Sequence, residues 1–404
     1  MHGSSFASAL ITLAWPLACP LAAQAPPDSP MFRGNPSHAG VYAAPTHPIK
    51  GTIAWSFETL GWDRYQKLED MDGDYMWPST PAVVGDRIYA AAGPFLYVLD
   101  LKGQMIRQIK LSSCTLASPA VSNGVVYLPT KDGKLNALDA QDGRTIWTAS
   151  IGNAGFLKMV DTWDVYQSSA TVAEGRVFVG SGDGRIYAFS AKDGHELWHV
   201  QTRHVVRATP AVAGGRVFCG SFDGHVYALD AQTGKTIWDV DTKTPGVPWK
   251  AVQGSCAIEN GLVYVGSRSA FFYGIDAATG AVRWKDSHDG SWVPSSPAVR
   301  DGIAYVGQSD DSKVCAVDAK GKRLWTRTVQ DHTFASPALA GDVLFVATNN
   351  NYNYNGKGHL YALEPKTGNP IWTLELPGSV WSSPVVAGNL VLLGCSDGKL
   401  YAIQ

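Results

Sequence analysis

The 404-residue chain contains 42 glycines, 11% aromatic residues and only 17% charged residues, and its formal net charge is -2. This composition favours many short strands joined by tight turns over a helix-rich chain. The balanced charge provides no basic stripe, which argues against a nucleic-acid partner.

Residues 1–25 form an apolar run that ends in Ala23-Gln24-Ala25, which predicts a secretory signal peptide cleaved after Ala25 and export to a periplasm or beyond. Cys19 offers a lipoprotein alternative, although the preceding residues match the acylation pattern poorly. Because Pro16 and Pro20 interrupt the run, it is not expected to span a membrane. No transmembrane segment is expected in the mature chain either. Residues 26–50 are interpreted as an N-terminal lead-in segment.

From residue 51 onward the chain repeats one pattern, seen clearly as GSFDGHVYALDAQTGKTIW from Gly220 to Trp238. Alternating apolar residues mark four short strands in each copy, and Asp-Gly pairs such as Asp223-Gly224 predict tight hairpins. Eight copies are present, and their third strands end at Asp100, Asp139, Ser190, Asp230, Asp276, Asp318, Glu364 and Gln404. The pattern predicts an all-β, eight-bladed β-propeller with four-stranded antiparallel blades over residues 51–404.

The last copy stops at Gln404, directly after its third strand. Residues 51–55 reproduce the missing fourth strand at the other end of the repeat region. We therefore expect the N-terminal strand around Trp55 to pair into the eighth blade and close the ring, which removes exposed sheet edges.

Seven tryptophans share one repeat position, four residues after a glycine, and are predicted to dock neighbouring blades. They are Trp55, Trp147, Trp198, Trp238, Trp284, Trp325 and Trp372. The first blade carries Arg107 at this position, so a looser junction is expected there.

Five cysteines remain after the predicted cleavage, and they replace different residues of the repeat. This distribution is typical of buried small hydrophobic side chains rather than of a disulfide framework. Because no Cys-x-x-Cys motif is present, a cysteine zinc site is not expected.

The motif from Ala228 to Trp238, Ala-x-Asp-x-x-Thr-Gly-x-x-x-Trp, resembles the tryptophan-docking motif of PQQ-like propellers. That family includes quinoprotein alcohol dehydrogenases and the outer-membrane assembly lipoprotein of the BAM complex. The segment from Met31 to Gly40 also resembles the lead-in of secreted PQQ-binding-like repeat proteins.

Long connections between blades place aromatic and polar residues on one predicted face, at the rim of the channel. We expect these side chains to hold a planar or sugar-like ligand, or a protein segment. The alternative is that the aromatic residues form small loop cores and that the cations are solvated. The candidate residues are Trp77, Trp163, Gln167, Arg207, Lys250, Gln253, Trp292, His332 and Trp381.

An acidic loop at residues 69–74 brings Asp70, Asp72 and Asp74 together and is a candidate calcium site, because hard cations prefer several oxygen ligands. Its spacing does not complete an EF-hand, and an ordinary acidic loop is the alternative. No other metal site and no catalytic residue is assigned.

The sequence favours an exported, non-catalytic binding or scaffold protein that docks a protein partner or a small ligand on its aromatic face. Resemblance to the assembly lipoprotein implies association with the outer membrane or its assembly machinery. The alternative is a quinoprotein alcohol dehydrogenase that uses PQQ and calcium. Members of that class carry an adjacent cysteine pair next to the cofactor, and this chain has no Cys-Cys pair and no c-type haem motif.

Overall fold

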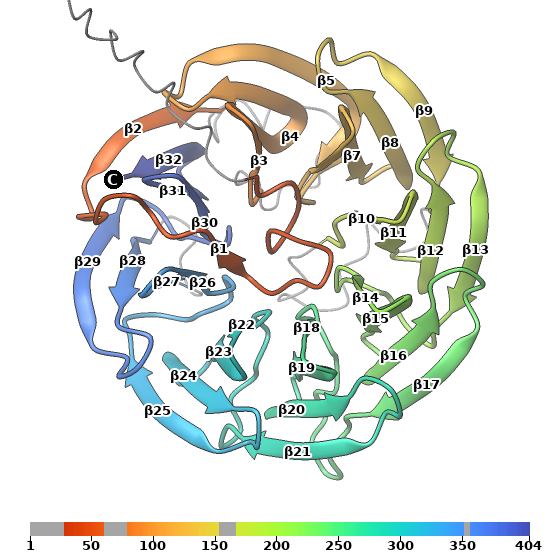
Figure 1. The fold of residues 1–404 in the computed structure, drawn as a ribbon, viewed down its shortest axis with the longest axis vertical. Helices are drawn as coiled ribbons and strands as arrows, with labels where there is room; N and C mark the ends of the chain where they lie inside the picture. The colour runs from red at the N-terminus through yellow and green to blue at the C-terminus, as the bar shows by residue number, and fades with distance from the viewer. Residues whose placement is uncertain (1–27, 60–78, 153–166, 351–355) are drawn as a thin grey trace, which may run out of the picture.

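A computed structural model describes residues 28–59, 79–152, 167–350 and 356–404. Eight antiparallel sheets radiate from a central axis and form a closed ring (Figure 1). The predicted eight-bladed, all-β propeller is therefore confirmed. No helix that could span a membrane is found in these ranges.

Blades 2 to 6 each contain four strands in chain order, from the channel outward. Their bounds are β6 (Ala120–Ser122), β7 (Val125–Thr130), β8 (Lys134–Asp139) and β9 (Thr145–Ser150) in blade 2; β10 (Thr171–Ala173), β11 (Arg176–Gly180), β12 (Arg185–Ser190) and β13 (Glu196–Gln201) in blade 3; β14 (Ala211–Ala213), β15 (Arg216–Gly220), β16 (His225–Asp230) and β17 (Thr236–Asp241) in blade 4; β18 (Ala257–Glu259), β19 (Leu262–Gly266), β20 (Phe271–Asp276) and β21 (Val282–Ser287) in blade 5; and β22 (Ala298–Arg300), β23 (Ile303–Gly307), β24 (Lys313–Asp318) and β25 (Arg323–Thr328) in blade 6.

The other three blades depart from this plan. Blade 1 contains β3 (Ala82–Val84), β4 (Arg87–Asp100) and β5 (Met105–Thr115), and β4 covers the positions of both middle strands. Blade 7 contains β26 (Ala338–Ala340), β27 (Val343–Ala347), β28 (Gly358–Leu363) and β29 (Pro370–Leu376), with β1 (Val41–Tyr42) added parallel to β26. Blade 8 contains β30 (Val385–Ala387), β31 (Leu390–Gly394), β32 (Lys399–Ile403) and β2 (Ile53–Glu58).

The N-terminal strand closes the ring as predicted. Strand β2 pairs antiparallel with β32, so that Ser56 lies opposite Tyr401 and Phe57 opposite Leu400. The outer edge of β32 is thus paired with a strand from the N-terminal end of the repeat region. This pairing gives the backbone N–H and C=O groups along that edge their hydrogen-bond partners.

The middle strands of each blade are buried, whereas the outer strands alternate between exposed and partly exposed residues. Middle strands are covered on both faces by neighbouring blades, which explains their nearly continuous apolar sequence. The Asp-Gly hairpins adopt the predicted geometry: Gly224 has φ +86°, and Asp223 Oδ1 accepts a hydrogen bond from His225 N at 2.8 Å.

The seven docking tryptophans join neighbouring blades in the same way. Each indole Nε1 donates to a main-chain carbonyl. For six of them the acceptor lies at the turn of the next blade, for example Ala277 O for Trp238 at 3.2 Å and Leu101 O for Trp55 at 3.0 Å, and for Trp372 it is Ile49 O, just before β2 of blade 8. The equivalent bonds are made by Trp147, Trp198, Trp284, Trp325 and Trp372. Only Trp198 of the seven is fully buried, so the rings pack across the junction with one edge open to solvent.

A glycine of the next blade makes room for each indole ring. A Cβ atom on Gly280 would lie 2.8 Å from the Trp238 ring. In blade 1, Arg107 holds the tryptophan position in the strand register, opposite Val98. The matching glycine of blade 2, Gly143, packs instead against Ile109, so an aliphatic side chain replaces the indole at this junction.

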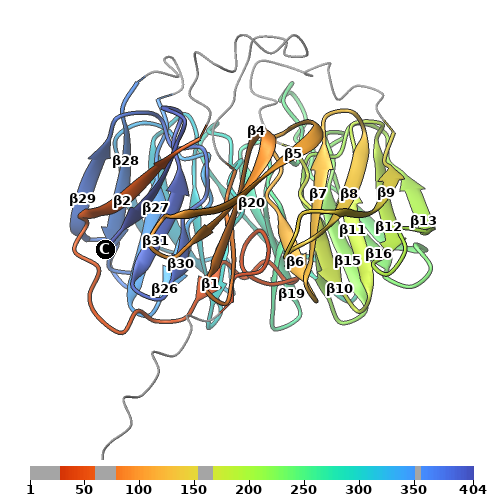
Figure 2. The ribbon, with the colours of Figure 1, turned by 90° about the horizontal axis from the view of Figure 1, so that it is seen from above.

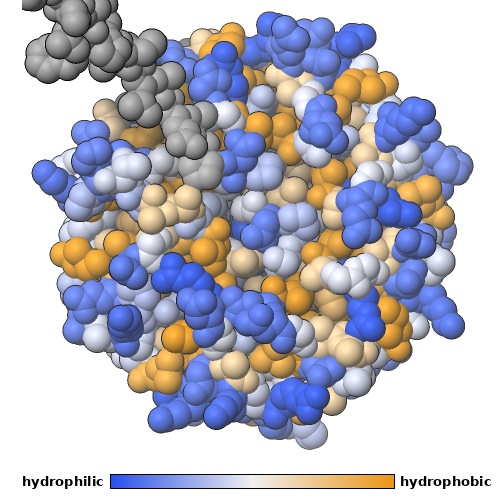
Figure 3. Space-filling model, in the orientation of Figure 1, coloured by the Kyte–Doolittle hydropathy of each residue, from blue (hydrophilic) through white to orange (hydrophobic). Residues whose placement is uncertain are grey.

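The lead-in segment, residues 28–50, closes one end of the channel (Figure 2). Its main-chain carbonyls accept hydrogen bonds from the inner strands of successive blades, as Pro36 O does from Val212 N at 2.7 Å and Gly40 O from Leu339 N at 2.9 Å. Further bonds of this kind reach Val83, Val121, Ile258 and Val299. Figure 3 shows this face of the molecule, with polar and apolar side chains interspersed over its centre.

Two polar side chains of the lead-in segment are fully buried. Arg33 donates from Nη2 to Pro297 O at 3.0 Å, and burial lowers its pKa to about 10. His38 Nε2 lies 3.1 Å from Thr171 Oγ1. Burial, with a smaller contribution from the Arg33 charge, lowers the pKa of His38 to about 3, so this ring is neutral in the folded chain.

Truncating one docking tryptophan should loosen one junction. For Trp238→Ala we expect a loss of about 2–3 kcal/mol in the free energy of unfolding, below the ~3–5 kcal/mol of a fully buried ring because Trp238 is partly exposed. Urea denaturation followed by far-ultraviolet circular dichroism measures it. Trp249→Ala is the control, since that side chain is 46% exposed; equal losses in the two variants would contradict the docking role.

The buried His38 should make stability depend on pH. Its folded pKa of about 3 lies below the ordinary value of 6.5, so as pH falls from 6.5 towards 3 the unfolded chain takes up a proton that the folded chain excludes. Stability from this group is therefore lost over that window, by at most about 1.4 kcal/mol per pH unit. Urea titrations between about pH 7 and about pH 4 should show a flatter pH dependence for His38→Gln. The control His195→Gln, at an exposed histidine, should retain the slope of the parent chain.

Candidate binding site in the central channel

A ring of hydroxyl side chains, one from each blade, surrounds the channel. Its members are Thr80, Ser118, Ser169, Thr209, Ser255, Ser296, Ser336 and Ser383. The main-chain N–H of one member donates to the hydroxyl oxygen of the next, as Thr209 N does to Ser255 Oγ at 2.8 Å. Seven such bonds occur, the last from Ser383 N to Thr80 Oγ1 at 2.9 Å. These bonds fasten the inner ends of the blades to each other.

The ring lines a hollow of about 580 Å³, including the part that opens to solvent. Phe32 of the lead-in segment lies at its closed end. A ligand would therefore enter from the opposite face, which carries the connections between blades (Figure 2).

A second layer lies towards the open end and consists of the residue two positions before each ring member. Its described members are Leu116, Gln167, Arg207, Gln253, Pro294, Phe334 and Trp381, and all seven line the hollow. The polar side chains come from three adjacent blades, 3 to 5, and the apolar ones from blades 6 to 8 and 2. The mouth of the channel is therefore polar on one side and aromatic on the other.

Gln167 is held on the polar side by hydrogen bonds to the end of blade 1 and to the connection that follows it. Its Oε1 accepts from Leu116 N at 3.0 Å and from Thr115 Oγ1 at 3.2 Å. Its Nε2 is buried without a hydrogen-bond partner among the described residues. A buried donor of this kind is satisfied when a water or ligand acceptor enters the hollow.

Gln253 is oriented by a second buried cation. Arg268 Nε donates to Gln253 Oε1 at 2.8 Å, and its guanidinium lies 4.5 Å from the ring centre of Trp292 and 5.0 Å from that of Phe222. Trp249 meets Trp292 edge to face at 5.2 Å. Trp292 thus packs in a small aromatic core beside the channel and does not line the hollow.

The aromatic side of the mouth is formed by Phe334 and Trp381, whose ring centres are 5.4 Å apart. Both side chains are buried, with relative exposures of 2% and 1%. The two rings are tilted by 52° to each other and form an apolar wall on the side of the channel opposite Arg207. A ligand with an acidic group and a planar or apolar body matches this arrangement.

The remaining candidates lie elsewhere. Lys250 is exposed, and His332 bridges to Asn349 through main-chain hydrogen bonds of 3.1 and 3.0 Å; neither residue lines the hollow. Trp77 and Trp163, together with the calcium candidates Asp70, Asp72 and Asp74, fall outside the described residues. Of the candidate residues, Gln167, Arg207, Gln253 and Trp381 line the hollow, and Lys250 and His332 do not; a binding role for any of them stays a prediction.

The hydroxyl ring, Phe32 and Arg268 were not identified from the sequence. The ring could have been found, because a serine or threonine precedes each inner strand at the same place in the repeat. Arg268 gave no such signal, since it lies in a hairpin turn and contacts Gln253 only through the fold.

The chemistry of the described lining is limited to hydroxyls, amides, one guanidinium and apolar side chains. Within that set there is no carboxylate, imidazole or thiol, and hence no general base that would activate the hydroxyls as nucleophiles and no carboxylate ligand for calcium. The described cysteines are buried, and burial raises the pKa of Cys256, Cys315 and Cys395 to about 12, which disfavours the thiolate in the absence of a metal ion. The arrangement suits binding rather than proton transfer.

A family model described as outer membrane protein assembly factor BamB matches residues 43–162, 157–287, 223–351 and 311–404. Curated relatives include the dehydrogenase subunit of a quinone alcohol dehydrogenase from Gluconobacter oxydans, 34% identical over 85 residues, and BamB from Moranella endobia, 32% identical over 117 residues. These matches cover 21% and 28% of this chain, but only 11% and 29% of the relatives. The chain thus matches only a minor part of the length of each.

Solved structures share the fold over most of the chain. BamB from Moraxella catarrhalis superposes with a TM-score of 0.68 at 20% identity, covering 88% of this chain and 100% of that one. A europium-containing methanol dehydrogenase superposes with a TM-score of 0.72 at 14% identity, covering 93% and 97%. The family model accounts for nearly the whole propeller, and the chain therefore belongs to the PQQ-like propeller family whose model is described as outer membrane protein assembly factor BamB.

Proposed function

We propose that this chain is an exported, non-catalytic binding protein that receives an acidic group of a protein partner or small ligand at the mouth of its channel. The observation that carries the proposal is the described lining, which contains Arg207 as its one charged side chain and no acid, imidazole or thiol. Such a site can hold an anion but has no group that would move a proton.

Arg207 lies between two amide side chains on adjacent blades, Gln167 and Gln253. A buried guanidinium binds carboxylates strongly because its hydrogen bonds are charge-assisted and can be bidentate. The amides add neutral donors beside it, and Phe334 and Trp381 add apolar contact on the other side. This combination favours a carboxylate attached to an apolar or planar body.

The proposed partner is a component of the outer-membrane assembly machinery. Relatives named assembly factor BamB support this choice, and the propeller shares its fold with one of them along that protein's whole length. Export requires the signal peptide proposed at residues 1–25, which leaves a mature chain of the lead-in segment and the propeller.

A photo-crosslinking amino acid at an exposed position beside the mouth tests this partner in the cells that produce the chain. Trp249, 46% exposed and adjacent to the Trp292 core, is the test position; Leu197, 43% exposed on the outer strand of blade 3, is the matched control. We expect position 249 to yield an adduct that mass spectrometry identifies as an assembly-machinery component, and position 197 to yield none. Equal adducts at both positions, or none at 249, would contradict the proposal.

A quinoprotein alcohol dehydrogenase is the second candidate, favoured by the quinone-dependent relatives and by the wall of Trp381. The donor set fits only in part: Arg207 and Gln167 could hold the carboxylates of PQQ, which would supply a redox-active quinone when bound. The described lining contains neither a carboxylate to hold calcium nor a vicinal disulfide, because each described cysteine is free. The residues therefore support PQQ as a ligand more readily than as a cofactor.

Titration of the purified chain with PQQ, with and without calcium, separates the candidates through quenching of tryptophan fluorescence. The binding proposal predicts no calcium-dependent, saturable quenching in the micromolar range and no alcohol-dependent dye reduction. Saturable quenching that requires calcium and is lost in Trp381→Leu would favour the dehydrogenase instead. Trp372→Leu, at a docking tryptophan away from the mouth, is the control for indirect effects.

A further inference from the structure

The junction between blades 5 and 6 holds a cluster of three metal-binding side chains away from the channel. Asp286 lies on β21, His288 directly follows that strand, and Cys315 lies on β24 of the next blade. One ligand atom of each residue lies within 4.8 Å of those of the other two. His288 and Cys315 are fully buried, and Asp286 is partly exposed.

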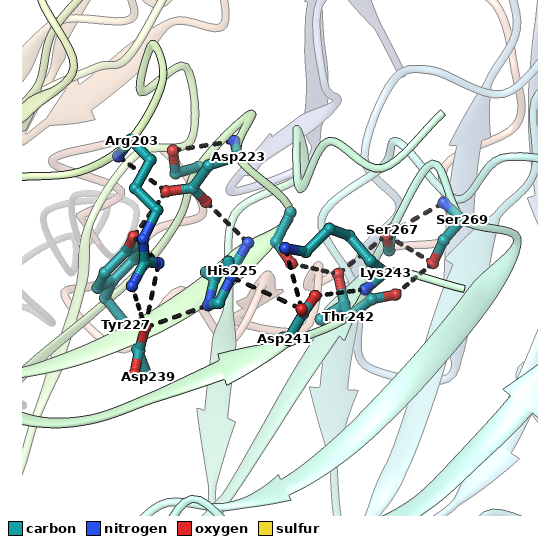
Figure 4. A network of polar contacts seen from close by, with 12 residues as sticks. Arg203, Asp223, His225, Tyr227, Asp239, Asp241, Thr242, Lys243, Ser267 and Ser269 are labelled. Carbon is teal, nitrogen blue, oxygen red and sulfur yellow. Dashed lines mark hydrogen bonds and ion pairs between the residues drawn. The ribbon is translucent and has the colours of Figure 1, made fainter. Parts of the chain in front are cut away.

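At the junctions of blades 3 with 4 and 4 with 5, the corresponding place is sealed by small hydroxyl side chains. Between blades 4 and 5, Thr242 Oγ1 lies 3.2 Å from Ser267 Oγ, and the Tyr273 hydroxyl donates to Thr242 O at 3.0 Å (Figure 4). Between blades 3 and 4, Ser221 Oγ donates to Thr202 Oγ1 at 3.2 Å. Ser269 Oγ also donates to Thr242 O at 2.7 Å and lies 2.9 Å from Ser267 Oγ, so the hydroxyl groups of the junction between blades 4 and 5 bond within the protein (Figure 4).

Four residues depart from this pattern at the junction of blades 5 and 6. His288 replaces the threonine, since its N–H donates to Ala270 O as Thr242 N does to Gly224 O. Gln308 replaces the serine, and Cys315, opposite Val306, replaces the tyrosine. Asp286, opposite Phe272, stands where Val240 stands opposite Val226. All four changes introduce a side chain with an atom that can ligate a metal.

The four substitutions are not explained simply by side chains of different size filling the same space, because they leave buried polar atoms at this junction. Replacement of tyrosine by cysteine frees space that the imidazole fills, but His288 Nδ1 has no hydrogen-bond partner among the described residues, and Nε2 has only the Asp286 carboxylate, at 3.3 Å. Gln308 Oε1 is likewise buried without a hydrogen-bond partner among the described residues. Buried polar atoms without partners are unfavourable, whereas the threonine and serine at the junctions of blades 3 with 4 and 4 with 5 satisfy each other.

We infer that Asp286, His288 and Cys315 form a zinc site that joins blades 5 and 6. Thiolate, imidazole and carboxylate are the usual ligands of Zn²⁺, and three of them leave a fourth position for water or for the Gln308 amide oxygen. His288 Nε2 lies 3.3 Å from Asp286 Oδ2, a separation expected between two ligands of one ion. The thiolate and the carboxylate balance the charge of the ion.

A second layer of contacts holds the proposed ligands in place. Arg323 of blade 6 donates to Asp286 Oδ2 from Nε at 3.1 Å and from Nη2 at 2.8 Å. Its Nη2 also donates to Ser287 O at 2.6 Å, which fixes the end of β21 just before His288. Such outer contacts commonly orient the ligands of a zinc ion. The partly exposed Asp286 gives the ion a route from solvent.

Titration of the metal-free, full-length chain with Co²⁺ tests the site directly, because cobalt replaces zinc and reports its ligands by absorption. We expect one equivalent to bind with a thiolate-to-cobalt charge-transfer band in the near ultraviolet, and one equivalent of Zn²⁺ to abolish that band by competition. Cys315→Ser should remove the band. His288→Thr, which introduces the residue found at the junctions of blades 3 with 4 and 4 with 5, should weaken Co²⁺ binding by more than about 100-fold, because it removes a direct ligand, whereas loss of an outer contact alone costs about 10- to 100-fold.

Cys219→Ser is the matched control, because Cys219 is also buried and free but lies in blade 4 outside the cluster. It should leave both the stoichiometry and the band unchanged. Circular dichroism confirms that each variant is folded, and Asp286→Asn provides a second test if Cys315→Ser does not fold. Lack of cobalt binding by the parent chain, or a band that survives both the Cys315 and the His288 substitution, would overturn the inference.

Discussion

Hydrogen bonds from the main chain of one blade to a hydroxyl side chain of the next hold the channel together, and the site depends on them. The residues that directly precede each inner strand lie beside the channel, where no neighbouring strand pairs with their backbone. Their N–H groups would be left unsatisfied without the neighbour's hydroxyl, and a buried N–H without a partner is costly. Serine and threonine meet this demand with side chains short enough for eight of them to converge.

This ring divides the channel into two layers with different freedom. The hydroxyl oxygens accept structural hydrogen bonds, so the lower layer has the same chemistry in every blade. The upper layer consists of the residues two positions before the ring members. These side chains do not take part in the repeated hydrogen bond between blades, so they can differ from blade to blade, as Gln167, Arg207 and Phe334 do. The lead-in segment closes the other end through Phe32. One fold can therefore present either a binding surface or a catalytic pocket, and the upper layer decides which.

Most of the fold could be predicted from the sequence because the same pattern of strands and turns occurs eight times. The docking position of Trp238 and the closure by the strand around Trp55 follow from local patterns that recur. Strand β1 could not be predicted in this way, because two residues carry too little periodicity and pair with a strand distant in sequence. The same limit applies to the channel: whether Arg207 lines it and Lys250 does not depends on how each connection between blades bends.

The cluster at blades 5 and 6 illustrates a different limit of sequence reasoning. Cysteine motifs are recognised by close spacing, yet His288 and Cys315 lie in different blades and meet only through the ring. A side-by-side comparison of the repeat copies reveals the departures, but only the structure shows that they converge at one point. Comparison of repeat copies thus identifies an unusual residue, and the structure shows which other residues lie next to it.

The pairing of β2 with β32 also sets an order of events during synthesis. A ribosome releases β2 long before β32, so Ile53 can pair with Ile403 and complete the eighth blade only after the intervening blades have been synthesised. The carbonyls of the lead-in segment likewise cannot bond to the inner strands of blades 4 to 7 until those blades have been synthesised. Because contacts between distant residues form slowly, the unfinished ring carries unpaired strand edges throughout elongation. Protection of the nascent chain, by export in an unfolded state or by a chaperone, is thus a physical requirement of this architecture.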